Sequence, residues 1–561
     1  MTDPTSSTMP DPKFDAIFVG GSAFTAGWER SRPLGVGVRD GRIAAIAQDD
    51  ELRAAGGGEV VELRGGMVLA AFHDAHAHPI AGAIELLLCD VSGEPDAEST
   101  LNRIAAYAQA NPDVPWIRGG GWTMSHFAGG TPSRTLLDAI VPDRPVVLLN
   151  RDHHGSWVNS RALEAAGIAK DTPDPADGRI ERDADGSPSG VLHEGAMRLL
   201  DGIAPAVPDE LAARALLRAQ EDFFALGIVG WQDAYVGATA GVDDLLETYL
   251  AAVADGSLQA RITAALWWKR GEGLGQLEQL IQKRERVASL GRSDVLLADA
   301  VKIMVDGVAE NFTAAMSQPY RDPHGHSTGE RGLTFLDPVQ LEEALVALDD
   351  AGFSVHLHAL GDRAVTASLD AIAAARRANG PTGLRHQLAH LQIVQRNDVA
   401  RFAELGATAN LQMLWAAVDD QLDELTFPFI AEELIARHYP LRELRDSGAV
   451  LAAGSDWPVS TADPMQAIHV AVNRAAPGAQ PDPRMDPTQA IDLATALSAY
   501  TAGSARANGR SASTGALTTG LLADLVVLDT DPFEISPADI YTVNVRETRL
   551  SGEPVYWAEE A

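Results

Sequence analysis

Short apolar runs alternate with polar-faced helical segments through the middle of the chain. The helical segments are rich in Ala, Leu and Glu, as in DELAARALLRAQEDFFALG, VQLEEALVALDDAG and RAVTASLDAIAAARRANG. Eight strand-like runs lie between such segments: MVLAAFHDAHAH, GIVGWQDA, ARITAALWW, AVKIMVDG, FSVHLHALG, LRHQLAHLQ, ATANLQM and AVLAAGSDWP. This alternation predicts parallel strands with helices outside, and eight is the number that a (β/α)8 barrel requires. We therefore expect an α/β barrel over 69–507.

Both ends of the chain have a different texture. Residues 13–68 form short apolar runs broken by glycine pairs, and RDGR predicts a hairpin with Asp40-Gly41 at its turn. Residues 508–561 repeat this texture in ADLVVLDTDP and IYTVNVRETRLSGEPVY. Two β-rich ends around a different middle predict one small domain built from both termini. Residues 1–12 are rich in Pro, Ser, Thr and Asp, which predicts a mobile tail.

One connection in the predicted barrel is far longer than a helix and two loops. It spans about 82–226, follows the first strand and contains the polar motif HHGSWVNSRALEAAG. We expect this insertion to cover the barrel mouth and to contribute to a substrate pocket. The candidate substrate-binding residues are His154, Trp157, Asn159 and Trp122. The alternative is that HHGSWVNS caps and packs a local helix, since Asn159 or Ser160 is a suitable N-cap for RALEAAG, and large aromatic residues mostly fill cores.

Composition and charge narrow the function classes. The chain has 561 residues, 46% of them apolar, and a formal charge of −34. It can bury a large core, but nucleic acid and anionic membranes would repel it. No signal-peptide pattern or membrane-length apolar run is present, so we expect a cytoplasmic protein that acts on a small molecule. A homodimer is the one assembly that we consider for this protein. The single cysteine, Cys89, leaves His, carboxylate or Lys-derived groups as metal ligands.

Polar side chains gather where the predicted strands end. In AAFHDAHAHPIAG, an extended backbone points His76 and His78 to the same face with Cα atoms roughly 6.5–7 Å apart, and Asp74 shares that face. Two imidazoles at this spacing can share a metal ion, and Asp74 could orient one of them. The active site of such a barrel lies at the carboxyl ends of its strands. The other residues at those positions are Lys302, His358, His390 and Asp456.

Each of these four residues also has a simpler interpretation. An unpaired ammonium is costly in an apolar run, so Lys302 reaches solvent, pairs with an acid such as Asp306, or becomes a carbamate that can bridge two cations. His358 and His390 are each compatible with a core histidine, and Asp456 with a cap of the following helix. The simpler interpretations must together place four potential ligands at four strand ends by accident, which favours one shared site.

The order of the motifs resembles the amidohydrolase superfamily, and more closely its YtcJ-like branch, amidohydrolase family 3. The matching segments, over roughly 14–556, are GWTMSHF, HHGSWVNSRAL, GSPSGVLHEGA, VKIMVDG, HLHALGDRAV, RHQLAHLQ, GSDWPV and LADLVVLDTDP. The resemblance implies a metal-dependent hydrolase of carbon–nitrogen bonds other than peptide bonds, with a β-sandwich made from both termini. One departure is Ala70-Ala71, where relatives usually have Pro-Gly before the metal-binding strand.

The resemblance also implies a role for each candidate residue. The implied ligands of one divalent metal are His76 and His78, and those of a second are His358 and His390. Lys302 would bridge the two as an N6-carboxylated lysine, while Asp456 would bind the first metal and act as general base and acid. We expect one or two zinc ions and cleavage of an amide-type, N-acyl or N-formyl bond by a metal-activated hydroxide. The alternatives are a cyclic-imide or carbamate hydrolase, a deaminase, and a non-catalytic metal-binding scaffold that lacks a ligand or the base.

Overall fold

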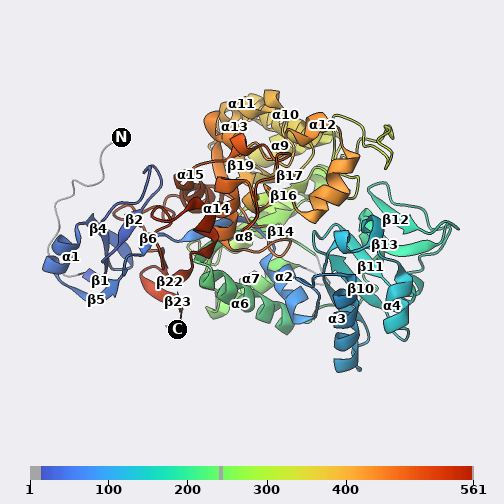
Figure 1. Cartoon of the computed structure of the whole chain (residues 1–561), viewed down its shortest axis with the longest axis horizontal. Coiled ribbons are helices and arrows are strands. Elements are labelled where there is room, and N and C mark those ends of the chain that lie inside the picture. The colour runs from blue at the N-terminus through green and yellow to red at the C-terminus, as the bar shows by residue number, and fades with distance from the viewer. Residues whose placement is uncertain (1–13, 239–243, 559–561) are drawn as a thin grey trace.

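A computed structural model describes residues 14–238 and 244–558, and a parallel eight-stranded barrel lies at its centre (Figure 1). Neighbouring strands are parallel and follow the order of the chain. They are β7 (Phe72–Ala77), β14 (Ile228–Val236), β15 (Arg261–Trp267), β16 (Leu296–Met304), β17 (Ser354–Ala359), β18 (Gln387–His390), β19 (Thr408–Leu411) and β20 (Val450–Ala453). All eight predicted runs supply one of these strands, so the predicted α/β barrel is confirmed.

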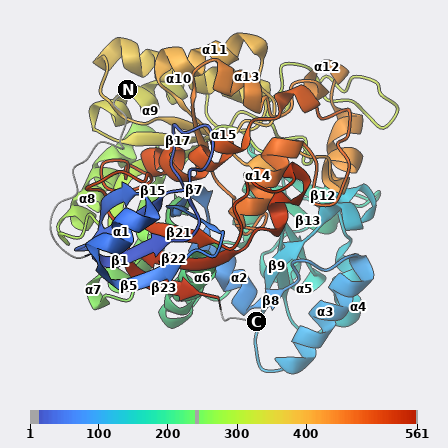
Figure 2. The same cartoon turned by 60° about the vertical axis from the view of Figure 1, so that its left-hand side comes forward.

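Helices surround the barrel (Figure 2). They are α2 (Pro79–Leu87), α6 (Asp209–Ala225), α7 (Leu245–Asp255), α8 (Leu277–Ala288), α9 (Pro338–Asp350), α10 (Asp362–Asn379), α11 (Arg396–Leu405), α12 (Glu432–Ile435), α13 (Leu441–Asp446), α14 (Pro464–Asn473), α15 (Leu493–Ser498) and α16 (Ser504–Ala507). Helix α10 buries Val365, Leu369 and Ile372, whose spacing places them on one face. Helix α9 begins at the N-cap Asp337, whose carboxylate accepts a hydrogen bond from the Val339 N–H. These sequence signals explain why helices alternate with the strands.

The first strand of the barrel is joined to the segment after the last strand by one carboxylate and by backbone hydrogen bonds. The Asp74 carboxylate on β7 accepts hydrogen bonds from the backbone N–H groups of His76 and Ser455, at 2.9 and 3.1 Å. The N–H of Asp456 donates to the His76 carbonyl at 2.7 Å. Asp74 therefore fixes the backbone of both candidate segments rather than orienting an imidazole ring, the role that the sequence suggested for it.

Strands from both ends of the chain form two flanking sheets. The four-stranded sheet has the order β4 (Arg42–Ala47), β3 (Gly35–Arg39), β1 (Phe14–Val19) and β5 (Gly57–Glu62), with α1 (Asp49–Ala55) beside it. The five-stranded sheet has the order β2 (Ser22–Phe24), β6 (Met67–Ala70), β21 (Leu525–Leu528), β22 (Val545–Leu550) and β23 (Glu553–Trp557). The predicted hairpin is confirmed, because Asp40 and Gly41 both have positive φ between β3 and β4. The predicted tail, 1–12, lies outside the described residues.

The predicted first strand, 67–78, is divided between two sheets. Residues of β6 pair with β21, and the chain passes into the barrel at Ala71, whose N–H donates to the Asp524 carbonyl. Strand β7 then ends at Ala77, and His78 is the N-cap residue of α2. The prediction of one continuous strand over 67–78 is therefore wrong, because the hydrogen-bond partners change from the flanking sheet to the barrel within this run.

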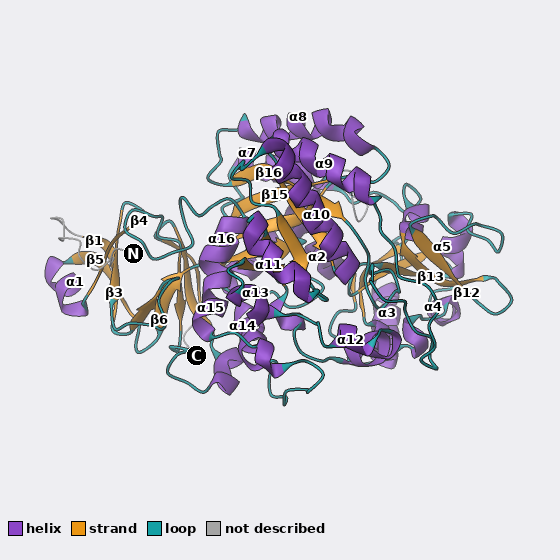
Figure 3. Cartoon of the chain, turned by 90° about the horizontal axis from the view of Figure 1, so that it is seen from above, coloured by secondary structure: helices purple, strands orange, loops and turns teal. Residues whose placement is uncertain are grey.

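The long connection between β7 and β14 forms a sheet of its own at the far end of the molecule (Figure 3). Its strands have the order β12 (Gly178–Arg182), β13 (Pro188–Glu194), β11 (Gly155–Val158), β10 (Val146–Asn150), β9 (Ile117–Trp122) and β8 (Cys89–Asp90). The helices α3 (Ala97–Ala110), α4 (Arg134–Ile140) and α5 (Ser160–Ala165) belong to the same segment. No helix within 14–238 or 244–558 combines the length and the apolarity needed to cross a membrane.

A buried ion pair joins the barrel to the flanking sheets and gives a stability prediction. Arg261 on β15 contacts both carboxylate oxygens of Asp524, at 2.6 and 2.7 Å. Asp524→Ala should lower the free energy of unfolding by about 3–5 kcal/mol, because it leaves the buried guanidinium without its partner. Asp222→Ala breaks an exposed pair with Arg218 and should cost less than about 1 kcal/mol. Equal losses of thermal stability in the two variants would contradict this account.

Candidate metal centre

The loop after β20 brings a carboxylate to two histidines at the end of β7. Asp456 Oδ1 lies 3.3 Å from His76 Nε2 and 3.1 Å from His78 Nε2. Asp456 has a positive φ of 57°, a costly backbone conformation for a residue other than glycine. The cap of α14 is Asp463 rather than Asp456, so the simpler interpretation of Asp456 as a helix cap is wrong. The structure therefore brings together His76, His78 and Asp456 as the sequence predicts.

The remaining three candidates lie on the same side of the barrel. Lys302 Nζ on β16 is 3.5 Å from His76 Nε2. The rings of His358 and His390 are 4.5 Å apart between centroids, and the His390 ring lies 4.7 Å from that of His76. Adjacent parallel strands end at the same mouth, which explains why residues so far apart in the chain meet here. All six predicted residues thus form one cluster.

The donor set fits a divalent metal ion. Ligand atoms of His76, His390 and Asp456 all lie within 4.8 Å of one another. Both ring nitrogens of His390 are buried and have no hydrogen-bond partner among the described residues. Burial lowers the pKa of His76 to about 3 and that of His390 well below its ordinary value. Both imidazoles are therefore neutral and can each offer a nitrogen lone pair to a metal ion. Burial opposes ionisation of Asp456, but a hydrogen bond from the His78 ring favours it, and the pKa of the Asp456 carboxyl lies well below the usual range.

The surroundings of Lys302 decide between its alternative interpretations. The side chain does not reach solvent, because the residue is only 2% exposed. Asp306 is not its partner, since the Asp306 carboxylate accepts hydrogen bonds from the N–H groups of Ala315, Leu360 and Gly361. Burial lowers the pKa of the Lys302 amine to about 7, with a smaller opposing effect of Asp456. A substantial neutral fraction near pH 7 keeps the carbamate interpretation open.

Two adjacent histidines of the insertion reach the cluster, each beside a glutamate. His153 Nε2 lies 2.9 Å from Glu85 Oε1, and its ring is 6.5 Å from that of His78. His154 Nδ1 lies 2.9 Å from Glu194 Oε1, and its ring is 5.3 Å from that of His358. Burial disfavours charge on His154, but Glu194 outweighs it and raises the pKa to about 9. The insertion therefore places polar groups at the barrel mouth, as predicted for His154.

The other three predicted substrate-binding residues are buried in the interior of the insertion, away from the barrel mouth. Trp122 and Trp157 are fully buried in an apolar cluster with Phe127, and the rings of the two tryptophans are 6.0 Å apart. The Asn159 side chain caps α5 by accepting from the Ala162 N–H and also bonds the backbone around Val146. The structure thus supports the capping and packing interpretation for these residues, because their polar groups are engaged inside the insertion.

Several polar residues beside the cluster are absent from the set predicted from the sequence. His153, Glu85 and Glu194 contact or flank the candidate ligands, and His356 Nε2 lies 2.8 Å from His76 Nδ1. The signal for His356 is its position in VHLHALG, two residues before His358 on the same strand face. Glu85 follows His78 by seven residues and Glu194 lies in the motif GSPSGVLHEGA, but neither stands at the end of a barrel strand, which is the signal that identifies the other residues.

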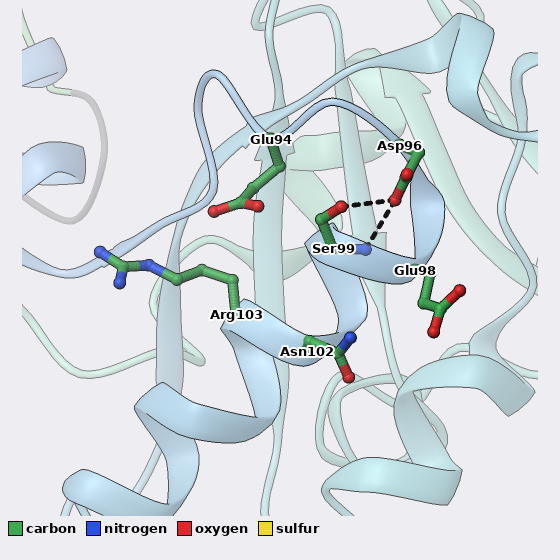
Figure 4. Close-up of a pocket in the computed structure, with 6 residues that line it drawn as sticks. All are labelled: Glu94, Asp96, Glu98, Ser99, Asn102 and Arg103. Atoms are coloured by element: carbon green, nitrogen blue, oxygen red, sulfur yellow. Dashed lines mark hydrogen bonds between the residues drawn. The ribbon is translucent and has the colours of Figure 1, made fainter.

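A surface hollow near the start of α3 does not belong to the cluster (Figure 4). Its lining residues are Glu94, Asp96, Glu98, Ser99, Asn102 and Arg103. Asp96 is already engaged as the N-cap of α3, because its carboxylate accepts from the Ser99 N–H at 2.8 Å. We therefore assign no function to this hollow.

Comparison with known proteins agrees with the geometry. The sequence model of the Amidohydrolase family matches residues 59–556. The chain belongs to the amidohydrolase family. It is 30% identical over 552 residues to the "Putative amidohydrolase YtcJ" of Bacillus subtilis, covering 96% of this chain and 99% of that relative. Family membership makes this protein a hydrolase of carbon–nitrogen bonds, which confirms the predicted enzyme class.

Two further comparisons place this amidohydrolase among named relatives. It is 29% identical over 573 residues to the "N-substituted formamide deformylase" of Arthrobacter pascens, covering 96% of this chain and 97% of that enzyme. A crystal structure of an uncharacterized metal-dependent hydrolase from Pyrococcus horikoshii superposes with a TM-score of 0.70 at 23% identity, covering 93% and 99% of the two chains. The likeness in structure agrees with the barrel and its flanking sheets.

The buried tryptophans generate a prediction about the insertion. Trp157→Ala should lower stability by about 3–5 kcal/mol, because it opens a cavity in the apolar cluster of the insertion. His154→Gln keeps an amide donor for the buried Glu194, so it should lower the melting temperature much less than Trp157→Ala while it changes KM or kcat. A Trp157→Ala protein that keeps its melting temperature and loses only substrate selectivity would contradict the structural role of Trp157.

Proposed function

We propose that this amidohydrolase cleaves an amide-type carbon–nitrogen bond, N-acyl or N-formyl, of a small molecule at the histidine cluster. The observation that carries the proposal is the buried Asp456 carboxylate, which lies within 3.3 Å of imidazole nitrogens of both His76 and His78. The similarity to the deformylase from Arthrobacter pascens supports the N-formyl class in particular. The alternative of a non-catalytic scaffold predicts a missing ligand or base, and all six predicted residues are present in the cluster.

The residues that would hold the metal are His76, His78, His358, His390 and Asp456, with Lys302 as a carbamate. When bound, a divalent ion would polarise the substrate carbonyl and lower the pKa of a water molecule. We propose zinc, because imidazole and carboxylate ligands suit it. The neutral amine of Lys302 is the form that can add CO2, and the lowered pKa supplies it near pH 7. One or two metal positions, a cytoplasmic location and a homodimer stay predictions.

Asp456 is the residue that we assign to proton transfer. Its carboxylate accepts a hydrogen bond from the adjacent His78 ring, which favours the ionised form, so it can accept a proton from the attacking water. The same carboxyl can then donate that proton to the leaving nitrogen, which departs poorly as an anion. The left-handed backbone at Asp456 and the hydrogen bond from its N–H to the His76 carbonyl hold the group at this position.

His154 is the residue that we assign to substrate binding. Glu194 Oε1 lies 2.9 Å from His154 Nδ1 and accepts a hydrogen bond from the Thr313 hydroxyl at 2.8 Å, so the glutamate is itself held in place. This support leaves the other ring nitrogen, Nε2, available at the mouth beside His358. A hydrogen bond from Nε2 to the substrate's carbonyl oxygen would orient the amide for attack.

Removal of metal is the first test of this function. Protein purified without chelator should contain zinc or another divalent metal, and exhaustive chelation should abolish hydrolysis of N-formyl or N-acyl amines. Zinc should restore the activity. Full activity in protein whose metal content is verified as zero would contradict the proposal.

Asp456→Asn tests the proton transfer. The variant keeps the size and one oxygen ligand but cannot accept a proton, so kcat should fall by roughly 10²–10⁴. Asp463→Asn is the matched control, since Asp463 caps α14 a few residues later and should leave kcat unchanged. The assignment fails if the Asp456→Asn enzyme keeps its metal and retains wild-type kcat on a substrate whose chemical step is rate-limiting.

Lys302→Ala tests the carbamate. The variant should lose metal content and activity together, and short carboxylates such as acetate or propionate should restore part of both by replacing the missing oxygen donor. Mass spectrometry of native protein should show the additional mass of CO2 on Lys302. Wild-type metal content in Lys302→Ala would rule out a ligand role for this residue.

A further inference from the structure

A layer of polar side chains lies inside the barrel directly beneath the histidine cluster. The layer comprises His356, Gln232, Gln387, Asn410 and Gln412, all 2% exposed or less. These residues belong to strands β14, β17, β18 and β19 or follow directly after β19. Barrel interiors of this kind are usually filled by branched apolar residues. A buried amide or imidazole needs hydrogen bonds, so the layer can be read as a set of donors and acceptors.

The direction of these hydrogen bonds is fixed first by a backbone carbonyl. The carbonyl of Ala75 can only accept, and it lies 2.8 Å from Asn410 Nδ2, which must therefore be the amide nitrogen. The same nitrogen donates to Gln387 Oε1 at 2.8 Å. Gln387 then presents its Nε2 to Gln232 Oε1 at 2.5 Å. The orientation of each amide is thus fixed by its hydrogen bond to the preceding residue of the series.

A second backbone group fixes the same orientation independently. The N–H of His390 can only donate, and it meets Gln412 Oε1 at 2.7 Å. Gln412 therefore points its Nε2 at Asn410 Oδ1, 3.3 Å away. This places the oxygen of Asn410 on the side opposite to Ala75, in agreement with the first assignment. Both anchors, Ala75 and His390, are adjacent to or part of the candidate ligand set.

The last two steps carry the orientation to a candidate ligand. Gln232 Oε1 lies 3.1 Å from His356 Nδ1, so that nitrogen must carry a proton. The two ring nitrogens of His356 face Gln232 and His76 rather than a carboxylate, and a buried cation without such a partner is costly, so the ring is neutral and its Nε2 accepts. His76 Nδ1, 2.8 Å away, must then be the donor. The proton of His76 is thereby placed on Nδ1, and Nε2 is left with a lone pair.

We infer that this relay from Ala75 through Asn410, Gln387, Gln232 and His356 sets the tautomer of His76 so that Nε2 is ready to bind metal. The inference rests on the proposed function. His76 Nε2 lies 3.3 Å from Asp456 Oδ1, so the lone pair faces an ionised carboxylate, an arrangement that a divalent cation stabilises. His356 and Gln232 are therefore positioning residues, which act on the site through His76.

The reverse orientation is disfavoured although it would relieve one orphan group. In the assigned orientation Gln232 Nε2 is buried without a hydrogen-bond partner in the described part of the chain. Turning the Gln232 amide would set its N–H groups against Gln387 Nε2, whose orientation is fixed by Asn410, so two donors would face each other at 2.5 Å. His356 could follow such a turn by exchanging its ring proton, so the contact between Gln387 and Gln232 is what holds the direction of the relay. One unpaired donor costs less than a pair of opposed donors at this distance.

The test measures zinc affinity of the full-length chain by competition with a chelator. His356→Leu removes the acceptor for His76 Nδ1 and should weaken zinc binding by about 10–100-fold, the usual effect of losing such a support. His356→Gln should recover part of this loss, because an amide can donate to Gln232 and accept from His76. Thr263→Val is the control, since it removes a buried hydrogen bond to the Asn508 carbonyl off the relay and should leave affinity within about twofold.

A second pair of variants keeps the test decisive if His356→Leu does not fold. Gln232→Leu removes the acceptor for His356 Nδ1 and should also weaken zinc binding, whereas Gln232→Glu keeps an acceptor oxygen and should bind zinc nearly as tightly as wild type. Wild-type affinity in His356→Leu or Gln232→Leu, or equal losses in Gln232→Leu and Gln232→Glu, would overturn the relay. A wild-type chain that binds zinc but hydrolyses no amide would contradict the proposed function alone, and one that binds no zinc would contradict both.

Discussion

The contact between the Asp456 carboxylate and the imidazoles of His76 and His78 is the interaction on which the site depends. A buried carboxylate is costly unless it is paired, and here its partners are neutral rings rather than cations. Such a set of lone pairs is stable when a cation joins it. The same segments also complete the barrel, because Asp74 binds the N–H of Ser455 and Asp456 binds the carbonyl of His76. Barrel closure and ligand geometry are therefore one arrangement.

The barrel, the insertion and the flanking sheets contribute differently to the site and to its stability. The barrel strands supply the candidate ligands, and the polar layer beneath them fixes the proton of His76. The insertion supplies His153 and His154, each held by a buried glutamate, while its tryptophans form a separate apolar core. The flanking sheets lie on the other side of the barrel and are joined to it by the Arg261–Asp524 pair. Function is thus concentrated at one mouth, and stability is distributed over the whole molecule.

The sequence predicts the barrel and the cluster well because both leave local patterns. Eight apolar runs separated by amphipathic helices define the strand order, and polar residues at strand ends identify His76, His78, Lys302, His358, His390 and Asp456. The sequence predicts less where partners are distant. The division of 67–78 at Ala71 depends on the strand that each half pairs with, and burial of Trp157 depends on packing against residues far along the chain. The alternation of side chains along the strand would predict that His356 shares the face of His358, but its partner Gln232 lies on another strand, which local alternation does not identify.

Anomalous diffraction at the zinc edge from crystals of the native protein tests the central claim most directly. The account predicts one or two anomalous peaks at the carboxyl end of the barrel, with a zinc-to-nitrogen distance of about 2.0–2.1 Å to His76 Nε2 and an oxygen of Asp456 in the coordination shell. Zinc that binds only outside the cluster, or coordinates His76 through Nδ1, would contradict it.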